Sequence, residues 1–98
     1  MDLSKDLIGE VELLYNPAIP KDGLAKPKQR VELYEELTPK SAWIAELIIL
    51  DNLPWYAGEK RKVKVRIMSD EFKTHVEENR PNLMVRYGSS VIGKLEFV

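Results

Sequence analysis

The stretch Ala42-Trp-Ile-Ala-Glu-Leu-Ile-Ile-Leu50 decides the fold class of this 98-residue chain. It carries a single charge, at Glu46, and contains no glycine or proline. Both of its alternating faces are apolar, with Trp43, Ala45, Leu47 and Ile49 on one and Ile44, Ile48 and Leu50 on the other. A strand exposed on one face alternates apolar and polar residues, whereas a strand covered on both faces does not. The stretch is therefore predicted to be a central strand that is buried on both sides.

Five further segments alternate apolar and polar residues, as strands with one exposed face do. They span residues 8–15, 30–36, 62–68, 83–87 and 91–98, and segment 62–68 has the clearest alternation. The short segment 30–36 is predicted as an edge strand. The residues predicted to face inward are Val11, Leu13, Tyr15, Val31, Leu33, Val63, Val65, Ile67, Leu83, Val85, Tyr87, Val91, Gly93, Leu95 and Phe97.

The segments between these strands hold all six prolines and most of the glycines. Residues 16–29 are predicted to form a long loop, and a tight turn at Gly88-Ser-Ser90 joins the last two strands as a hairpin. The four-residue spacing of Phe72 and Val76 predicts one or two helical turns behind Ser69 or Asp70 as the N-cap. Closure is favoured for six strands in so short a chain, because a barrel has no free edges to aggregate.

We therefore predict a single all-β domain over residues 1–98, a small closed or nearly closed antiparallel barrel of about six strands with at most one short helix. The chain is 44% hydrophobic and 32% charged with a net charge of -1, which is typical of a soluble globular domain and favours neither nucleic-acid nor membrane binding. It has no cysteine, which excludes disulfides and thiolate chemistry. Neither a secretory signal nor a stretch long enough to span a membrane is present, so we expect a cytoplasmic protein.

The closing segment, residues 83–98, resembles the end of the C-terminal (third) β-barrel domain of elongation factor Tu. That family closes with a strand, an Arg-x-Gly turn, and a valine or isoleucine followed by glycine and a last strand. Arg86, Gly88, Ile92 and Gly93 match this pattern. The resemblance implies a barrel that binds transfer RNA or protein partners and has no catalytic site.

Other parts of the chain extend this resemblance in a changed order. Ala45–Leu50 and Val63–Met68 are similar to the first long strand of that barrel and to its partner, and Ile8–Leu13 is similar to a displaced strand. The strands that lie between the first two blocks in the family are missing, and extra strands stand at the N-terminus instead. The chain also lacks a Gly-x-x-x-x-Gly-Lys-[Ser/Thr] loop, so we predict that it binds no nucleotide.

Basic residues gather in the segment Lys60-Arg-Lys-Val-Lys-Val-Arg66, which holds five of the fifteen in the chain. Strand alternation puts four of them in one row, with about 6.6 Å between successive members. Such a row could contact a phosphate backbone with salt-dependent affinity. The alternative is a solvated outer face whose charges pair across strands with Glu32, Glu46 or Glu96. The row consists of Lys60, Lys62, Lys64 and Arg66.

Trp55 and Tyr56 precede this row in the sequence. They lie in a predicted loop, because Pro54 and Gly58 on either side of them interrupt strand pairing. Aromatic side chains can stack on unpaired bases or anchor a protein partner. In a small barrel, a loop tryptophan can instead plug an open end. An exposed aromatic residue here would form one continuous surface with the basic row.

His75 is the only histidine, and Glu71, Glu77 and Glu78 lie near it in the sequence. Such groups can hold a metal or perform acid–base chemistry. Because no second histidine or orienting partner is evident, we interpret His75 as a solvated residue. Ser89-Ser90 has no nucleophile motif around it and is interpreted as turn chemistry. We therefore predict no catalytic residue, no metal site, no cofactor and no enzymatic activity.

The predicted function is a non-catalytic binding module that recognises a protein partner. An RNA- or translation-associated accessory protein is the alternative, and an enzyme with a substrate pocket in the barrel is a distant third. The predicted binding residues are Trp55, Tyr56, Lys60, Lys62, Lys64 and Arg66.

Overall fold

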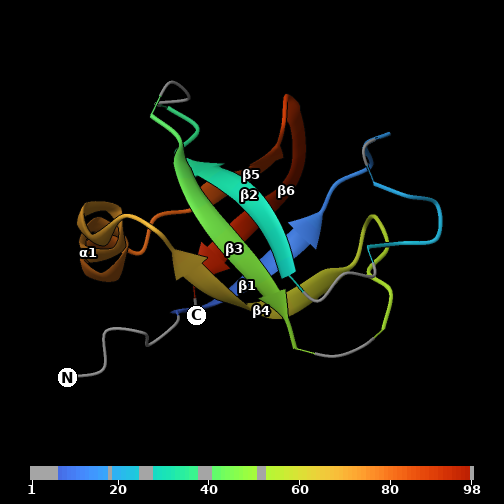
Figure 1. Ribbon diagram of the computed structural model, residues 1–98, viewed down its shortest axis with the longest axis horizontal. Helices are drawn as coiled ribbons and strands as arrows, with labels where there is room; N and C mark the ends of the chain where they lie inside the picture. The colour runs from blue at the N-terminus through green and yellow to red at the C-terminus, as the bar shows by residue number, and fades with distance from the viewer. Residues whose placement is uncertain (1–6, 18, 25–27, 38–40, 51–52, 98) are drawn as a thin grey trace.

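The strands and the helix follow one another in the order expected from the sequence, with one helix between the fourth and fifth strands (Figure 1). The computed structural model describes residues 7–17, 19–24, 28–37, 41–50 and 53–97. Within these ranges the elements are β1 (Leu7–Leu13), β2 (Lys28–Tyr34), β3 (Trp43–Ile49), β4 (Lys60–Ile67), α1 (Asp70–Asn79), β5 (Leu83–Tyr87) and β6 (Ser90–Phe97).

The strands close into a barrel in the order β1-β4-β3-β2-β5-β6, with β6 pairing back onto β1. Every pairing is antiparallel. The prediction of a small closed antiparallel barrel with one short helix is therefore confirmed. The prediction of an edge strand at residues 30–36 is wrong, because β2 is paired with β3 on one side and β5 on the other.

The strand at Ala42–Leu50 is confirmed, but its burial on both faces is wrong. Ala45, Leu47 and Ile49 point into the barrel and are buried. Ile44 and Leu50 are 46% and 53% exposed. A small barrel is filled by one face of each strand, so the second apolar face of β3 remains on the outside.

Two tyrosines predicted to face inward lie at the surface. Tyr15 is 87% exposed because β1 ends at Leu13, before the alternation reaches it. Tyr87 is 52% exposed at the end of β5, next to a register shift between Val85 and Arg86. The shift leaves Ile92 as an extra residue of β6, and its side chain is buried although the alternation placed Val91 inward.

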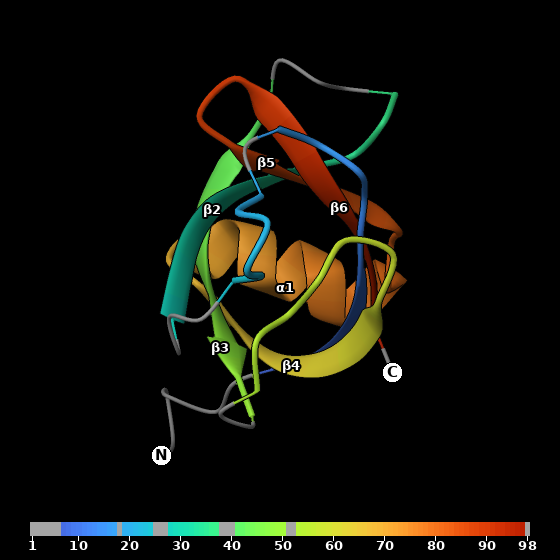
Figure 2. The ribbon, with the colours of Figure 1, turned by 90° about the vertical axis from the view of Figure 1, so that its right-hand side faces the viewer.

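The two open ends of the barrel are covered by different elements. Figure 2 shows α1 lying across one end and the loop before β4 crossing the other. Phe72 and Val76 are the buried residues of α1, and both belong to the hydrophobic core. Trp55, from the loop, belongs to the same core and is fully buried.

The helix is longer than predicted, because ten residues make nearly three turns. The Ser69 hydroxyl accepts a hydrogen bond from the backbone N–H of Phe72 at 3.2 Å, as the N-cap prediction requires. Asp70 and Glu71 in the first turn interact favourably with the positive end of the helix dipole. At the other end, Arg80 adopts the left-handed conformation of a C-cap, with φ 47°.

Replacing Ser69 with alanine is expected to lower the free energy of unfolding by about 1 kcal/mol, because the N–H of Phe72 loses its acceptor. The matched change Thr74→Ala, at an exposed position of the same helix, is expected to stay within about 0.5 kcal/mol. Urea denaturation followed by circular dichroism compares the two. Equal losses in both variants would show that the cap does not stabilise the helix.

Candidate functional site

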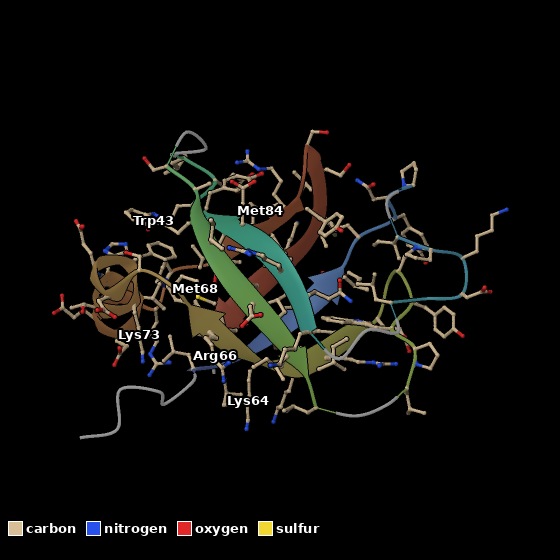
Figure 3. All side chains as sticks on the ribbon, in the orientation of Figure 1. Trp43, Lys64, Arg66, Met68, Lys73 and Met84 are labelled. Carbon is tan, nitrogen blue, oxygen red and sulfur yellow. The ribbon has the colours of Figure 1, made fainter. Side chains whose placement is uncertain are left out.

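The basic row lies on the outer face of β4, as its alternation predicts. Lys60, Lys62 and Lys64 are exposed and Arg66 is half-buried, whereas the intervening Val63, Val65 and Ile67 are buried. In Figure 3 the side chains of Lys64 and Arg66 project from the same side of the barrel.

Carboxylates flank the row on both neighbouring strands. On β1, Glu10 lies opposite Lys62 and Glu12 lies opposite Lys60, and on β3 Glu46 lies opposite Arg66. Two long ion pairs result, Lys60 Nζ to Glu10 Oε1 at 3.9 Å and Arg66 Nη1 to Glu46 Oε1 at 3.8 Å. Exposed pairs of this kind contribute about 0–1 kcal/mol each, so they leave the row available to a partner.

The middle of the row differs from its ends. The side chains of Lys62 and Lys64 make no hydrogen bond or ion pair with any described residue. Of the glutamates proposed as cross-strand partners, Glu46 binds Arg66, whereas Glu32 binds Arg86 at 3.3 Å and Glu96 lies opposite Glu10. The two central lysines are therefore the part of the row whose charge the neighbouring strands do not pair.

Apolar side chains stand next to these lysines. Ile8 of β1 and Ile48 of β3 are both directly opposite Lys64. Ile8 is exposed and Ile48 is half-buried. Directly opposite residues have Cβ atoms about 4.5–5.5 Å apart, so the lysine stem and the two isoleucines form one continuous strip.

The aromatic pair expected beside the row is divided between core and surface. Trp55 is fully buried, its Nε1–H donates to the carbonyl of Glu59 at 3.0 Å, and its backbone pairs with Leu24. It plugs the barrel end, which was the alternative to a binding role. Tyr56 is 47% exposed and remains at the surface.

Arg61 is the fifth basic residue of the cluster, and it fixes the loop that carries Trp55. Its guanidinium donates to the carbonyl of Leu53 at 2.8 Å and to that of Pro54 at 2.6 Å. It also contacts Glu59 at 3.2 Å. No sequence pattern indicates this role, because both carbonyl acceptors belong to backbone outside the strand.

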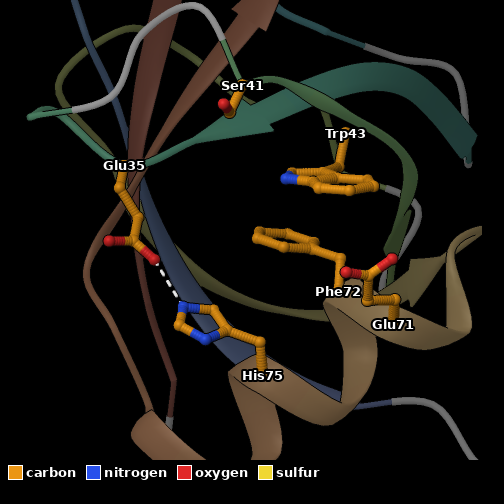
Figure 4. A pocket seen from close by; sticks show the side chains of 6 residues that line it. All are labelled: Glu35, Ser41, Trp43, Glu71, Phe72 and His75. Carbon is orange, nitrogen blue, oxygen red and sulfur yellow. Dashed lines mark hydrogen bonds and ion pairs between the residues drawn. The ribbon is translucent and has the colours of Figure 1, made fainter.

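His75 has an orienting partner that the sequence did not reveal. Its Nε2 lies 2.6 Å from Glu35 Oε1, forty residues earlier in the chain (Figure 4). Its Nδ1 lies 3.2 Å from the amide nitrogen of Asn79. His75 is exposed, as the sequence interpretation expects, but the expectation that it has no orienting partner is wrong. In the described part of the chain, no three histidine, aspartate or glutamate side chains gather as a metal site.

Comparisons with known proteins give no relative. No family model, no curated protein and no solved structure matches the chain. In the described ranges, no helix has the length and apolar character needed to cross a bilayer.

Proposed function

We propose that this chain is a non-catalytic protein-binding module whose partner presents acidic and apolar side chains to the outer face of β1, β4 and β3. We name this region the docking face and define it by Ile8, Ile48, Lys60, Lys62, Lys64 and Arg66. The observation that carries the proposal is the position of Lys62 and Lys64. Their charges are unpaired among the described residues, and Lys64 lies between two apolar side chains.

A protein partner suits this face better than a polyanion. Protein interfaces surround an apolar core with a polar rim, and long lysine stems can pack over isoleucine. Glu10, Glu12 and Glu46 border the row and would repel a phosphate backbone that follows it. Trp55 is buried and so offers no stacking surface, which leaves Tyr56 as the exposed member of the predicted aromatic pair.

A non-catalytic role is supported by the surroundings of His75. Its two ring nitrogens face Glu35 and Asn79, so neither is directed at a serine hydroxyl in the described structure. General-base catalysis requires a nitrogen within hydrogen-bond reach of the group that it deprotonates.

The second candidate is an RNA- or translation-associated accessory protein. It is favoured by the closed barrel of six antiparallel strands, which is compatible with the resemblance to the elongation factor barrel, and by the basic row itself. In an RNA-associated protein, the lysines of the basic row would contact phosphates.

The double change Lys62→Ala and Lys64→Ala is expected to slow association with the protein partner by about tenfold at low salt, with a smaller difference at high salt. The matched control is Lys21→Ala with Lys94→Ala, which removes two exposed lysines outside the docking face. Tagged forms of the wild type and both variants are compared in pull-downs from native extract, with and without nuclease. The captured protein is identified, and its association rate is then measured with purified components.

Two results would decide against the proposal. Capture that disappears with nuclease, together with a log–log salt slope about 1.4 units shallower in the Lys62/Lys64 variant, would favour RNA. Equal capture by the wild type and both variants would show that the docking face is only a solvated surface.

A further inference from the structure

A pocket away from the docking face lies between α1 and the adjoining ends of β2 and β3 (Figure 4). Its volume is about 330 Å³, which is within the range of small-ligand sites. The residues that line it are Glu35, Ser41, Trp43, Glu71, Phe72 and His75.

Three aromatic rings build one wall of this pocket. Trp43 and Phe72 are stacked with ring centroids 5.1 Å apart and an angle of 10° between their planes. The ring of His75 continues the stack at 6.1 Å from Phe72. Because Phe72 is buried in the core and His75 is held by Glu35 and Asn79, the wall is preorganised.

Two carboxylates, those of Glu35 and Glu71, supply hydrogen-bond acceptors to the pocket. Glu35 uses one carboxylate oxygen for His75, and its other oxygen has no partner among the described residues. The same holds for the whole carboxylate of Glu71. None of the described residues that line the pocket is a lysine or an arginine.

The tautomer of His75 follows from its neighbours. Asn79 places an amide nitrogen, a donor, against Nδ1, so Nδ1 accepts and Nε2–H donates to Glu35. The imidazole therefore offers no free N–H to the pocket, and the two carboxylates are left to contact a ligand.

We propose that this pocket binds the guanidinium group of an arginine side chain presented by a protein partner. A guanidinium is planar, stacks on aromatic rings and donates up to five hydrogen bonds in a fixed fork. Its plane can stack on the faces of Trp43 and His75 that Phe72 does not cover, and its N–H groups suit the carboxylates of Glu35 and Glu71. An ammonium group is compact and strongly hydrated and lacks the planar face, and an anion would be repelled by both carboxylates.

Two hydrogen-bond donors of the pocket remain to contact the backbone of the peptide that carries the arginine. Neither the indole N–H of Trp43 nor the hydroxyl of Ser41 has a hydrogen-bond partner among the described residues. In Figure 4 the indole nitrogen is at the end of the ring nearest Ser41 and Glu35. A backbone carbonyl next to the arginine side chain can accept from these groups, which gives a peptide an advantage over a free cation.

The test uses the two tryptophans of the chain as probe and internal control. Nuclear magnetic resonance resolves each indole N–H, and a Trp43→Phe variant assigns them. Titration with N-acetyl-arginine amide is expected to shift the Trp43 signal saturably, with a dissociation constant on the order of a millimolar for so small a probe. The Trp55 signal should not move, because this indole is buried and bound to Glu59. The neutral isostere N-acetyl-citrulline amide should give no saturable shift.

Charge variants separate the pocket from general electrostatic attraction. Glu71→Gln and Glu35→Gln each keep the shape of the side chain, and each is expected to weaken binding by about tenfold. Glu77→Gln, an exposed position of the same helix, should leave the affinity unchanged. The proposal is overturned if the citrulline probe or acetate shifts Trp43 as strongly as the arginine probe does. It also fails if all three glutamine variants bind equally well.

Discussion

Replacing Trp55 with alanine is expected to lower the free energy of unfolding by about 3–5 kcal/mol, which is a large share of the 5–15 kcal/mol typical of a small domain. Trp55 is the largest side chain that is fully buried, and its loop crosses the end of the barrel opposite α1. The change removes its apolar contacts and also leaves the carbonyl of Glu59 without the indole donor.

Tyr56→Ala is the matched control, because it truncates the neighbouring aromatic residue at a half-exposed position. Its effect is expected to stay within about 0.5 kcal/mol. Urea denaturation followed by circular dichroism gives both values. If the two variants lose the same stability, Trp55 is not a barrel plug and its burial contributes little.

The sequence predicted the strands well because each strand of a small barrel has one inward face with a period of two. Val63, Val65 and Ile67 illustrate this, since polar residues separate them and all three are buried. The apolar outer face of β3 misled the interpretation. Ile44 lies on the outside of the barrel. One strand alone does not predict this, because closure of the whole sheet decides which face of the strand the core occupies.

The errors at Tyr15 and Tyr87 have a local cause. Alternation predicts direction only while a strand continues in register, and these residues lie beyond the end of β1 and beside the register shift between β5 and β6. A shift of one residue reverses the face to which the following side chains point. Strand ends and bulges are set by the neighbouring strands, so a single segment carries little information about them.

The two candidate sites differ in how far their geometry can be predicted from the sequence. The basic row belongs to one strand, so its spacing predicts its geometry directly. The pocket beside His75 combines Glu35, which follows β2, with Trp43 from β3 and Phe72 from α1. Residues that are far apart in the chain meet there only because β2 ends and β3 begins where α1 crosses the barrel. Without the barrel topology, nothing in the sequence pairs Glu35 with His75.

Replacing Phe72 with alanine is the second change for which we expect a loss of about 3–5 kcal/mol. Phe72 is 4% exposed, packs in the core and supports the ring of Trp43. Of the ten residues of α1, only Phe72 and Val76 are buried, so the helix loses half of its buried anchors. Glu77→Ala, on the exposed side of the helix, should change stability by no more than about 0.5 kcal/mol.

The place of the damage distinguishes this variant from Trp55→Ala. The loop of Trp55 is also held by backbone pairing with Leu24 and by Arg61, whereas α1 is held chiefly by side chains and by the bond from His75 to Glu35. Hydrogen exchange of Phe72→Ala should therefore show the amides of α1 losing protection before those of the strands. Uniform loss of protection across the chain would show instead that the helix and the barrel unfold as one unit, and that the helical end is no weaker than the plugged end.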